Sequence, residues 1–175
     1  AAPEDTLKKL LADGEFLRRL RAAKTRVQAG FMALDPKSGA VLAWVGSRDF
    51  EQDPFDHVQA ARRQPGSTFK PFVYGAAFAK GMLPTDTLID QAVEIPLGGK
   101  QVWRPTDGRT PPSGEAMELR DGLAYSKNTI TAQLMQQVGP ERVAQLARAM
   151  GVRESKLEAV PALALGTSSV TLKEM

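Results

Sequence analysis

The chain has 175 residues, 42% of them hydrophobic, and its 23 basic and 20 acidic side chains leave a net charge of +3. This length is enough for one ordinary domain with a buried core. The lack of cysteine excludes a disulfide framework, a cysteine nucleophile and a thiolate zinc site, and a single histidine argues against a histidine-based metal cluster. No apolar run approaches the roughly 18 residues of a membrane span, and residues 1–15 are too polar for a signal peptide, so we expect any membrane attachment to lie outside this sequence.

Residues 1–28 are predicted to form a basic helical arm or linker. They carry seven basic and four acidic side chains, whereas residues 29–175 carry sixteen of each. Leucines at helical spacing over residues 4–24, interrupted at Asp13 and Gly14, predict one or two short amphipathic helices. A nucleic-acid-binding protein would carry basic side chains across its body with aromatic rings among them. Since the body is neutral and only 6% of residues are aromatic, we predict no nucleic-acid partner; contact of the arm with a phosphate-rich surface is the alternative.

Two apolar runs, at residues 27–34 and 40–46, follow the arm and are separated by the turn-forming sequence Asp35–Gly39. Proline presets one backbone angle of such a turn, and glycine permits a positive one. The pattern predicts a β-hairpin that leads a sheet buried on at least one face, with Trp44 in the core.

The rest of the chain alternates irregular and helical segments. Residues 47–66 are polar and interrupted by proline and glycine, which predicts a long loop of a kind that is often functional. Helical spacing predicts a helix over residues 67–80 that ends at Gly81, whereas residues 82–113 hold only short strand-like pieces. Three further helices are predicted, at residues 114–124, 126–138 and 141–150.

Residues Thr171–Glu174 have the spacing of a capping box, in which a threonine caps a helix and a glutamate returns a hydrogen bond. This predicts a new helix just where the sequence ends. A lone hairpin with several helices is too little for a closed layered domain. We therefore expect the chain to be part of a domain whose remaining strands come from a further segment or from a second chain.

Ser67 and Lys70 are the leading candidates for chemistry. Residues three apart share one face of a helix, with Cβ atoms about 5–6 Å apart, so the lysine can reach the serine hydroxyl. A serine needs an adjacent base to become a nucleophile, and a lysine is a base only when its surroundings keep it neutral. Pro65 and Gly66 allow a sharp entry that places Ser67 at the helix start, where exposed amides can stabilise an oxyanion. Pro71 should distort the first turn. The alternative is a capping serine with a solvated lysine.

A second motif, Ser126-Lys127-Asn128, opens another predicted helix, and Asn128 is the only asparagine of the chain. A hydroxyl and a carboxamide one residue apart could relay a proton and hydrogen-bond a substrate amide. The alternative is a capping serine beside a helix-start asparagine. Two such motifs in this order, each at the start of a helix, are a stronger signal than either one alone.

The segment Arg63–Tyr74 (RQPGSTFKPFVY) resembles the active-serine segment of class A penicillin-binding proteins, the bifunctional peptidoglycan synthases. Residues 31–46, Tyr125–Asn128 and Leu165–Ser168 are similar to neighbouring segments of their transpeptidase domain, and the likeness covers nearly everything after the arm. The resemblance implies an α+β fold, the penicillin-recognising serine transpeptidase fold, in which helices flank an antiparallel sheet. It assigns residues 29–175 to the N-terminal portion of that domain, without its C-terminal strands.

Two departures limit what the resemblance transfers. The family's third motif, a Lys-Thr/Ser-Gly triplet on a strand, follows the Ser-x-Asn element, but no such triplet occurs after Asn128. Lys37-Ser38-Gly39 matches the letters but lies between the two apolar runs, so we interpret it as a turn. The glycosyltransferase domain that precedes the transpeptidase in this family has no counterpart in residues 1–28. We therefore expect this chain alone to lack part of the substrate cleft and to be inactive.

The resemblance implies D,D-transpeptidation of peptidoglycan stem peptides, with no metal and no cofactor. Ser67 would attack the carbonyl between two terminal D-alanines, and Lys70 would take its proton. Ser126 would pass a proton toward the leaving amine, and Asn128 would hold the substrate amide. An amine of a neighbouring stem peptide would then resolve the acyl-enzyme, and β-lactams would acylate Ser67 as mimics of the dipeptide. Such a chain is expected at the periplasmic, extracytoplasmic face of the cytoplasmic membrane.

Two other functions stay open from the sequence. A serine β-lactamase or β-lactam sensor of the same fold could use the same serine–lysine pair, but it would need a water-activating group that the sequence does not identify. A non-catalytic wall-binding or scaffold domain could keep the fold without the chemistry.

Overall fold

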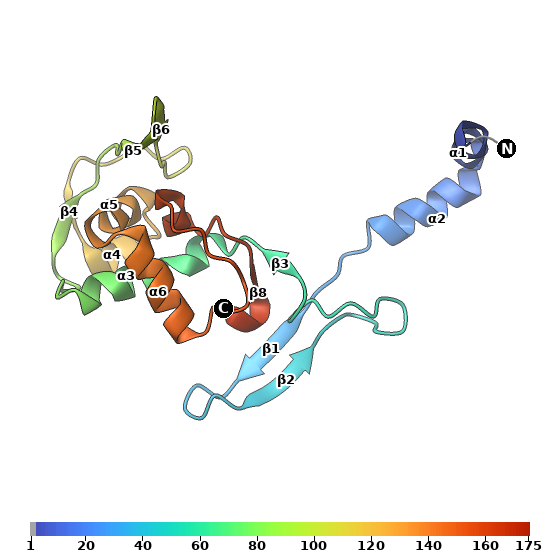
Figure 1. The fold of residues 1–175 in the computed structure, drawn as a ribbon, viewed down its shortest axis with the longest axis horizontal. Coiled ribbons are helices and arrows are strands. Elements are labelled where there is room, and N and C mark those ends of the chain that lie inside the picture. The colour runs from blue at the N-terminus through green and yellow to red at the C-terminus, as the bar shows by residue number, and fades with distance from the viewer. Residues whose placement is uncertain (1–2) are drawn as a thin grey trace.

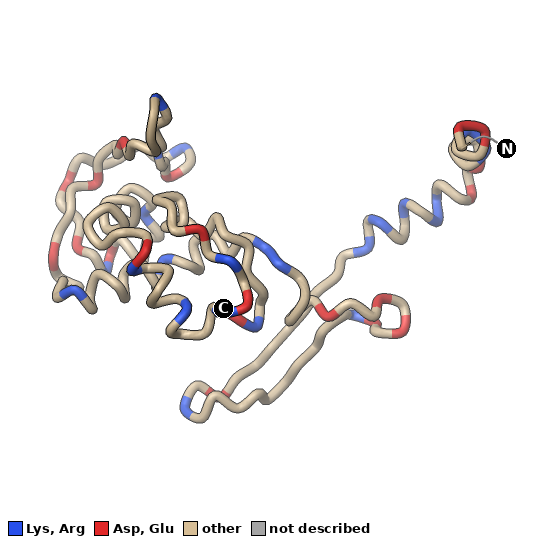
Figure 2. The backbone as a smooth tube through the Cα atoms, in the orientation of Figure 1, with Lys and Arg blue, Asp and Glu red and all other residues tan. Residues whose placement is uncertain are grey.

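The structure is a computed structural model that describes residues 3–175. It consists of an N-terminal arm, a projecting hairpin and a helical body (Figure 1). The arm contains α1 (Pro3–Ala12) and α2 (Gly14–Lys24), and the carboxylate of Asp13 caps α2 by accepting hydrogen bonds from the amides of Glu15 and Phe16. The predicted pair of short helices is thereby confirmed. Basic residues follow one another along α2 (Figure 2), and none of the described helices has the length and apolarity to cross a bilayer.

The predicted hairpin consists of β1 (Phe31–Leu34) and β2 (Val41–Val45), which pair antiparallel. In the turn, the carboxylate of Asp35 accepts hydrogen bonds from the amide of Lys37 at 2.9 Å and from the hydroxyl of Ser38 at 2.8 Å. The interpretation of residues 37–39 as a turn is therefore confirmed.

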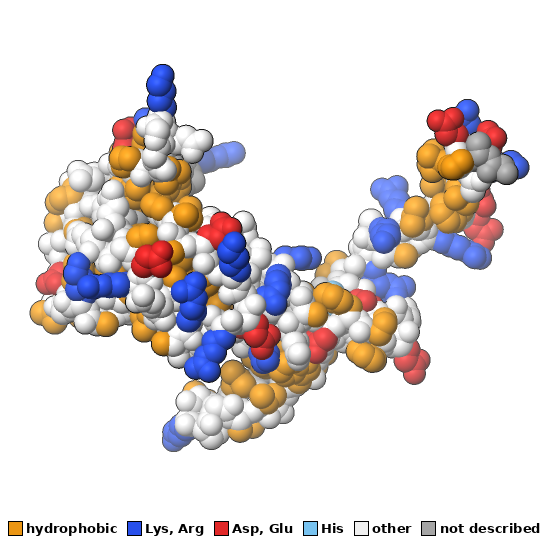
Figure 3. Space-filling model, in the orientation of Figure 1, with side chains coloured by type: hydrophobic (Ala, Val, Ile, Leu, Met, Phe, Trp, Pro, Cys, Tyr) orange, Lys and Arg blue, Asp and Glu red, His pale blue; other side chains and the backbone are white. Residues whose placement is uncertain are grey.

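In the part of the chain that the structure describes, the hairpin does not begin the expected sheet buried on one face. Within residues 3–175, β1 pairs with β2 alone, and every residue of β2 is exposed. Figure 3 shows apolar side chains gathered over the hairpin, and they include Phe31, Val41 and Leu42. Trp44, expected in the core, is 38% exposed, and its indole nitrogen donates to Asp56 at 3.0 Å. The apolar pattern predicted the two strands correctly. Burial of their side chains would need further elements packed against the hairpin, and residues 3–175 place none there.

The body is built around α3 (Lys70–Ala79), which continues directly from the 3-10 turn η1 (Gly66–Phe69). The tighter turn confirms the distortion predicted from Pro71. Phe69 of η1 and Val73 of α3 are fully buried, and they share one core cluster with Leu134 of α5 (Asn128–Val138). The other helical elements in contact with α3 are α4 (Leu119–Ala124), α6 (Pro140–Met150) and η2 (Pro161–Leu165). Burying an apolar helix on several sides provides the main stabilisation of the body and fixes its first turn in space.

Short antiparallel strand pairs border the helices. They are β3 (Arg62–Arg63) with β8 (Val170–Thr171), β4 (Thr87–Ile89) with β7 (Ala116–Glu118), and β5 (Ile95–Gly98) with β6 (Gln101–Trp103). The prediction of helix over residues 114–118 is wrong, because Met117 pairs with Leu88 and the segment is extended as far as Glu118. Pairing with a distant strand has overridden the local pattern.

The capping box at the C-terminal end is confirmed at the start of η3 (Leu172–Glu174). The Glu174 carboxylate accepts hydrogen bonds from the Thr171 amide at 3.1 Å, the Thr171 hydroxyl at 2.9 Å and the Ser155 amide at 2.9 Å. Burial opposes ionisation of this carboxyl group, but the hydrogen bonds outweigh it and lower its pKa to about 2. The box therefore holds the end of the chain against the segment that follows α6.

Candidate active site

Ser67 lies in η1, directly before α3, and is exposed. Gly66, with φ of +60°, makes the sharp entry that the sequence predicted. Its backbone packs against Gly166 at the end of η2, where a Cβ atom would lie 2.3 Å from the Gly66 carbonyl oxygen. Contact between two glycines thus lets η2 support the turn that carries the candidate nucleophile.

Lys70 is the first residue of α3, and it is buried, with 1% of its surface exposed. Its ammonium nitrogen donates to the Ser126 carbonyl at 2.5 Å, to the Ser126 hydroxyl at 3.0 Å and to Oδ1 of Asn128 at 2.7 Å. In the described chain these three hydrogen bonds of Nζ go to the second motif rather than to the Ser67 hydroxyl. The two sequence motifs therefore meet at the lysine.

Burial lowers the pKa of Lys70 to about 8, against the opposing effect of the negative charge of Asp107. At pH 7 this pKa leaves about one amine in ten uncharged, compared with about one in three thousand at the ordinary value. The site therefore supplies a base near neutral pH, which a solvated lysine would not.

Ser126 occupies the tight turn between α4 and α5 and has φ of +56°, the one non-glycine residue with positive φ among residues 3–175. A serine in this region carries a backbone strain of about 1 kcal/mol. The conformation directs its carbonyl oxygen and its hydroxyl to the same lysine. Strain of this kind, at the point where two motifs meet, is typical of a functional position.

Asn128 is the first residue of α5, and both ends of its carboxamide have protein partners. Its nitrogen donates to the Thr106 carbonyl at 2.6 Å, while its oxygen accepts from Lys70. The amide orientation is thereby consistent, because each atom has a partner of the complementary kind. Among residues 3–175, the Thr106 carbonyl is the one hydrogen-bond acceptor of this nitrogen, which leaves its second hydrogen unused.

Asp90 and Asp107 are functional candidates that the sequence reasoning missed. The Lys127 ammonium lies 2.8 Å from Asp90 and 3.0 Å from Asp107. Asp90 is buried and also accepts a hydrogen bond from the Thr129 hydroxyl at 2.6 Å. Both acids come from irregular segments far from residue 126 in the chain, so no local spacing could have indicated them.

Ser67, Ser126 and Asn128 line one open cavity of about 330 Å³, together with Asp107, Thr110, Tyr125 and Lys127. The nucleophile candidate therefore faces the motif that binds Lys70. Within residues 3–175 no three His, Asp or Glu side chains are grouped in a way that could hold a metal ion. The cavity instead provides hydroxyls and a carboxamide, and the buried Lys70 amine is hydrogen-bonded to two of its lining residues, Ser126 and Asn128. This is the chemistry of acyl transfer.

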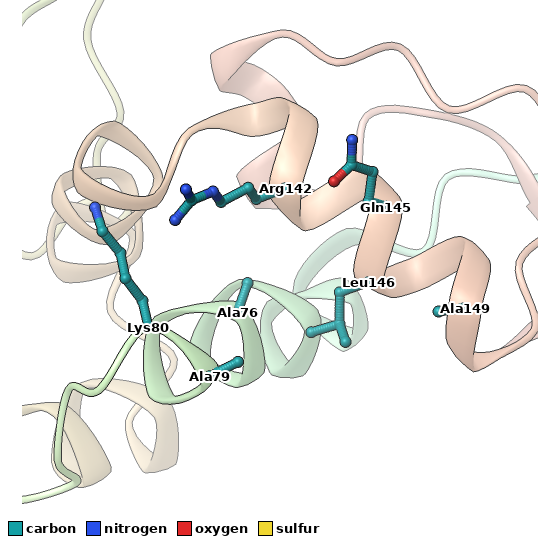
Figure 4. A pocket seen from close by; sticks show the side chains of 7 residues that line it. All are labelled: Ala76, Ala79, Lys80, Arg142, Gln145, Leu146 and Ala149. Atoms are coloured by element: carbon teal, nitrogen blue, oxygen red, sulfur yellow. The ribbon is translucent and has the colours of Figure 1, made fainter.

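A second hollow of about 390 Å³ lies between α3 and α6 (Figure 4). Its floor is apolar, with Ala76 and Leu146, and the charged ends of Lys80 and Arg142 lie at its rim. It offers no hydroxyl nucleophile, and it lies toward the end of α3 opposite to Ser67. We therefore place the candidate chemistry at the start of α3.

Comparison with known proteins agrees with this geometry. Residues 29–162 match the family of the penicillin-binding protein transpeptidase domain. Penicillin-binding protein 1A of Neisseria meningitidis is 41% identical over 149 residues, which are 83% of this chain and 18% of the relative. Penicillin-binding protein 2D of Bacillus subtilis is 34% identical over 154 residues, which are 87% of this chain and 22% of the relative. The chain thus spans about a fifth of the length of these relatives.

Solved structures show the same fold. Penicillin-binding protein 1A from Haemophilus influenzae superposes with a TM-score of 0.78 and 33% identity over 84% of this chain and 22% of that one. Penicillin-binding protein A from Mycobacterium tuberculosis, solved as its penicillin G acyl-enzyme complex, gives a TM-score of 0.68 at 22% identity over 88% of this chain and 46% of that one. The α+β transpeptidase fold expected from the sequence is confirmed, and the chain belongs to the penicillin-binding protein transpeptidase family.

Proposed function

We propose that this chain carries the nucleophile and the base of a serine D,D-transpeptidase that cross-links peptidoglycan stem peptides. One observation supports the proposal above the others. The buried Lys70 amine, with its pKa lowered to about 8, is bonded to Ser126 and Asn128, and these residues share a cavity with Ser67.

The proposed reaction has two stages. The Ser67 hydroxyl adds to the carbonyl carbon of the penultimate D-alanine while its proton passes to the neutral Lys70 amine. The tetrahedral intermediate collapses when the amide C–N bond breaks, and the proton reaches the leaving D-alanine amine through Ser126. The amine of a second stem peptide then attacks the Ser67 ester, which forms the new amide bond and restores the serine hydroxyl. Asn128 orients the acyl donor through its remaining amide hydrogen.

β-Lactams would acylate Ser67 in the same way, because the serine would open their strained amide. Peptidoglycan stem peptides lie outside the cytoplasmic membrane, so the chain would act at the outer face of that membrane. Residues 1–175 alone should not acylate, because the family's Lys-Thr/Ser-Gly strand contributes to the cleft. The experiment is therefore labelling of the complete polypeptide that carries this sequence with a fluorescent penicillin. We expect a long-lived adduct that the Ser67→Ala variant loses and that the Ser38→Ala control, altered in the hairpin turn, retains.

The result separates the alternatives. An adduct that hydrolyses within a catalytic cycle would indicate a β-lactamase, and the proposed transpeptidation would be wrong. A folded protein that never labels would indicate a scaffold domain. Labelling that survives Ser67→Ala would assign the nucleophile to another residue.

A further inference from the structure

We propose that Asp107 is a positioning residue of the acyl-transfer site, whose carboxylate fixes the turn that presents Ser126 and Asn128 to Lys70. The inference rests on the proposed function and adds to it a residue outside the two sequence motifs. It follows from how each carboxylate oxygen of Asp107 is used.

The two oxygens of Asp107 bind neighbouring residues of the second motif. Oδ1 accepts a hydrogen bond of 2.6 Å from the backbone amide of Asn128, and Oδ2 lies 3.0 Å from the ammonium nitrogen of Lys127. The Asn128 amide is at the N-terminal end of α5, where no carbonyl of the preceding turn can accept its hydrogen. Asp107 therefore caps the helix from a distant loop and sets the rotation of its first turn.

The same loop also orients the Asn128 side chain. The Thr106 carbonyl accepts a hydrogen bond of 2.6 Å from the carboxamide nitrogen, so the carboxamide oxygen is directed to Lys70. Backbone pairing between Asp107 and Thr110 shapes this loop. Two consecutive residues of the 104–115 loop thus hold both the backbone and the side chain of Asn128.

Asp90 also binds the turn at residues 126–128, through Lys127. Its buried carboxylate binds Lys127 at 2.8 Å, the Thr129 hydroxyl at 2.6 Å and the Ser113 amide at 3.0 Å. Lys127 thereby bridges two acids that come from different segments of the chain. Because Lys127 lies between Ser126 and Asn128, this bridge resists rotation of the turn that holds Ser126 at positive φ.

Asp107 has a second effect, which distinguishes its role from simple support. It lines the cavity with Ser67, and its negative charge raises the pKa of Lys70 against the effect of burial. Among residues 3–175, the other ionisable groups that line this cavity are Lys127 and Tyr125. Asp90 is paired with Lys127, and Tyr74 lies four residues after Lys70 on α3. Removal of the Asp107 charge should therefore move the pH midpoint of acylation to lower pH, whereas mere loosening of the fold would lower the rate without that acid shift.

The test compares Asp107→Asn and Asp107→Ala in the complete polypeptide, with the rate of acylation by fluorescent penicillin measured from pH 6 to pH 10. Asparagine keeps an oxygen for the Asn128 amide but loses the charge, so we expect a severalfold lower rate above pH 8 and an acid shift of the midpoint. Alanine also removes the acceptor, and its rate should fall at least about tenfold. The matched control is Asp121→Asn on α4, because among residues 3–175 the Asp121 carboxylate makes no hydrogen bond or ion pair, and we expect wild-type values.

Each outcome is decisive. If both Asp107 variants acylate with the wild-type rate and midpoint, the inference is wrong while the proposed function stands. If Asp107→Asn lowers the rate with no acid shift, and a core variant of the same melting temperature lowers the rate equally, Asp107 is merely structural. If Asp107→Ala does not fold, the asparagine variant alone decides between these results. Failure of the wild-type protein to label at Ser67 would instead contradict the proposed function.

Discussion

The ammonium nitrogen of Lys70 lies 2.7 Å from the carboxamide oxygen of Asn128, although the two residues open different helices. The contact joins α3 to α5 at their N-terminal ends and makes the second motif the immediate environment of the base. The turn at residues 126–128 thus fixes the position of the lysine amine, and burial keeps the amine apart from bulk water.

Acylation should depend on the protonation of Lys70. Because burial lowers its pKa to about 8, the neutral fraction rises with pH, and the rate should increase up to a midpoint near pH 8 and then level off. Lys70→Arg keeps the charge at all these pH values and should reduce the rate by a factor of about 100 or more. Stopped-flow acylation between pH 6 and pH 10 measures both. Lys80→Arg, at the other end of the same helix, is the control, and a pH-independent rate in the wild type would contradict the role of Lys70.

Substitution of Ser126 should separate chemistry from backbone strain. Ser126→Gly and Ser126→Ala both remove the hydroxyl, so each should slow acylation by about 100-fold. Glycine relieves the positive φ of +56° and alanine does not; the glycine variant should therefore be more stable than the alanine variant by about 1 kcal/mol. Chemical denaturation and acylation rates test the two effects separately. Equal stability of the two variants would show that the turn relaxes without cost.

The contact between η2 and the turn of Ser67 should be intolerant of any side chain at position 166. In Gly166→Ala, a Cβ atom would lie 2.3 Å from the Gly66 carbonyl oxygen, on a backbone with φ of +68°. We expect a loss of about 3 kcal/mol or more, together with slower acylation at Ser67. Gly99→Ala is the matched control, since its φ is +58° and no atom lies within 4 Å of the added Cβ. It should lose about 1 kcal/mol from φ strain alone. A similar loss in both variants would contradict the importance of this contact.

Asp90 should contribute stability that is lost in acid. Burial opposes its ionisation, but hydrogen bonds from Lys127, Thr129 and the Ser113 amide outweigh burial and lower its pKa to about 2. Since the folded-state pKa lies below the unfolded value of 3.8, the contribution is complete above about pH 4 and disappears as the pH falls through about 2. It amounts to about 2 kcal/mol. Urea unfolding of Asp90→Asn at pH 7 and pH 3 should show the larger loss at pH 7; an equal loss at both pH values would contradict the assignment.

Several features of this protein follow from local sequence. The spacing of apolar residues predicted the helix that begins near Ser67 and the helix that begins near Asn128, because a helix buries one face at a fixed period. Proline and glycine predicted the sharp entry before Ser67 and the tight first turn. The capping box at Thr171 needed only residues three apart. Each of these features depends on residues only a few positions apart, so a short segment of the sequence is enough to predict it.

Other features required the folded chain. The segment that ends at Glu118 is a strand only because residues 87–89 lie beside it, and Trp44 is exposed because no described segment covers the hairpin. The sequence by itself determined which side chains could perform acyl transfer, since a serine, a lysine, a second serine and an asparagine at helix starts are chemical and local facts. Only the tertiary structure decided that Lys70 is buried against the second motif and that Asp107 binds that motif. Hydrogen-bond partners and dielectric surroundings depend on which distant segments pack together.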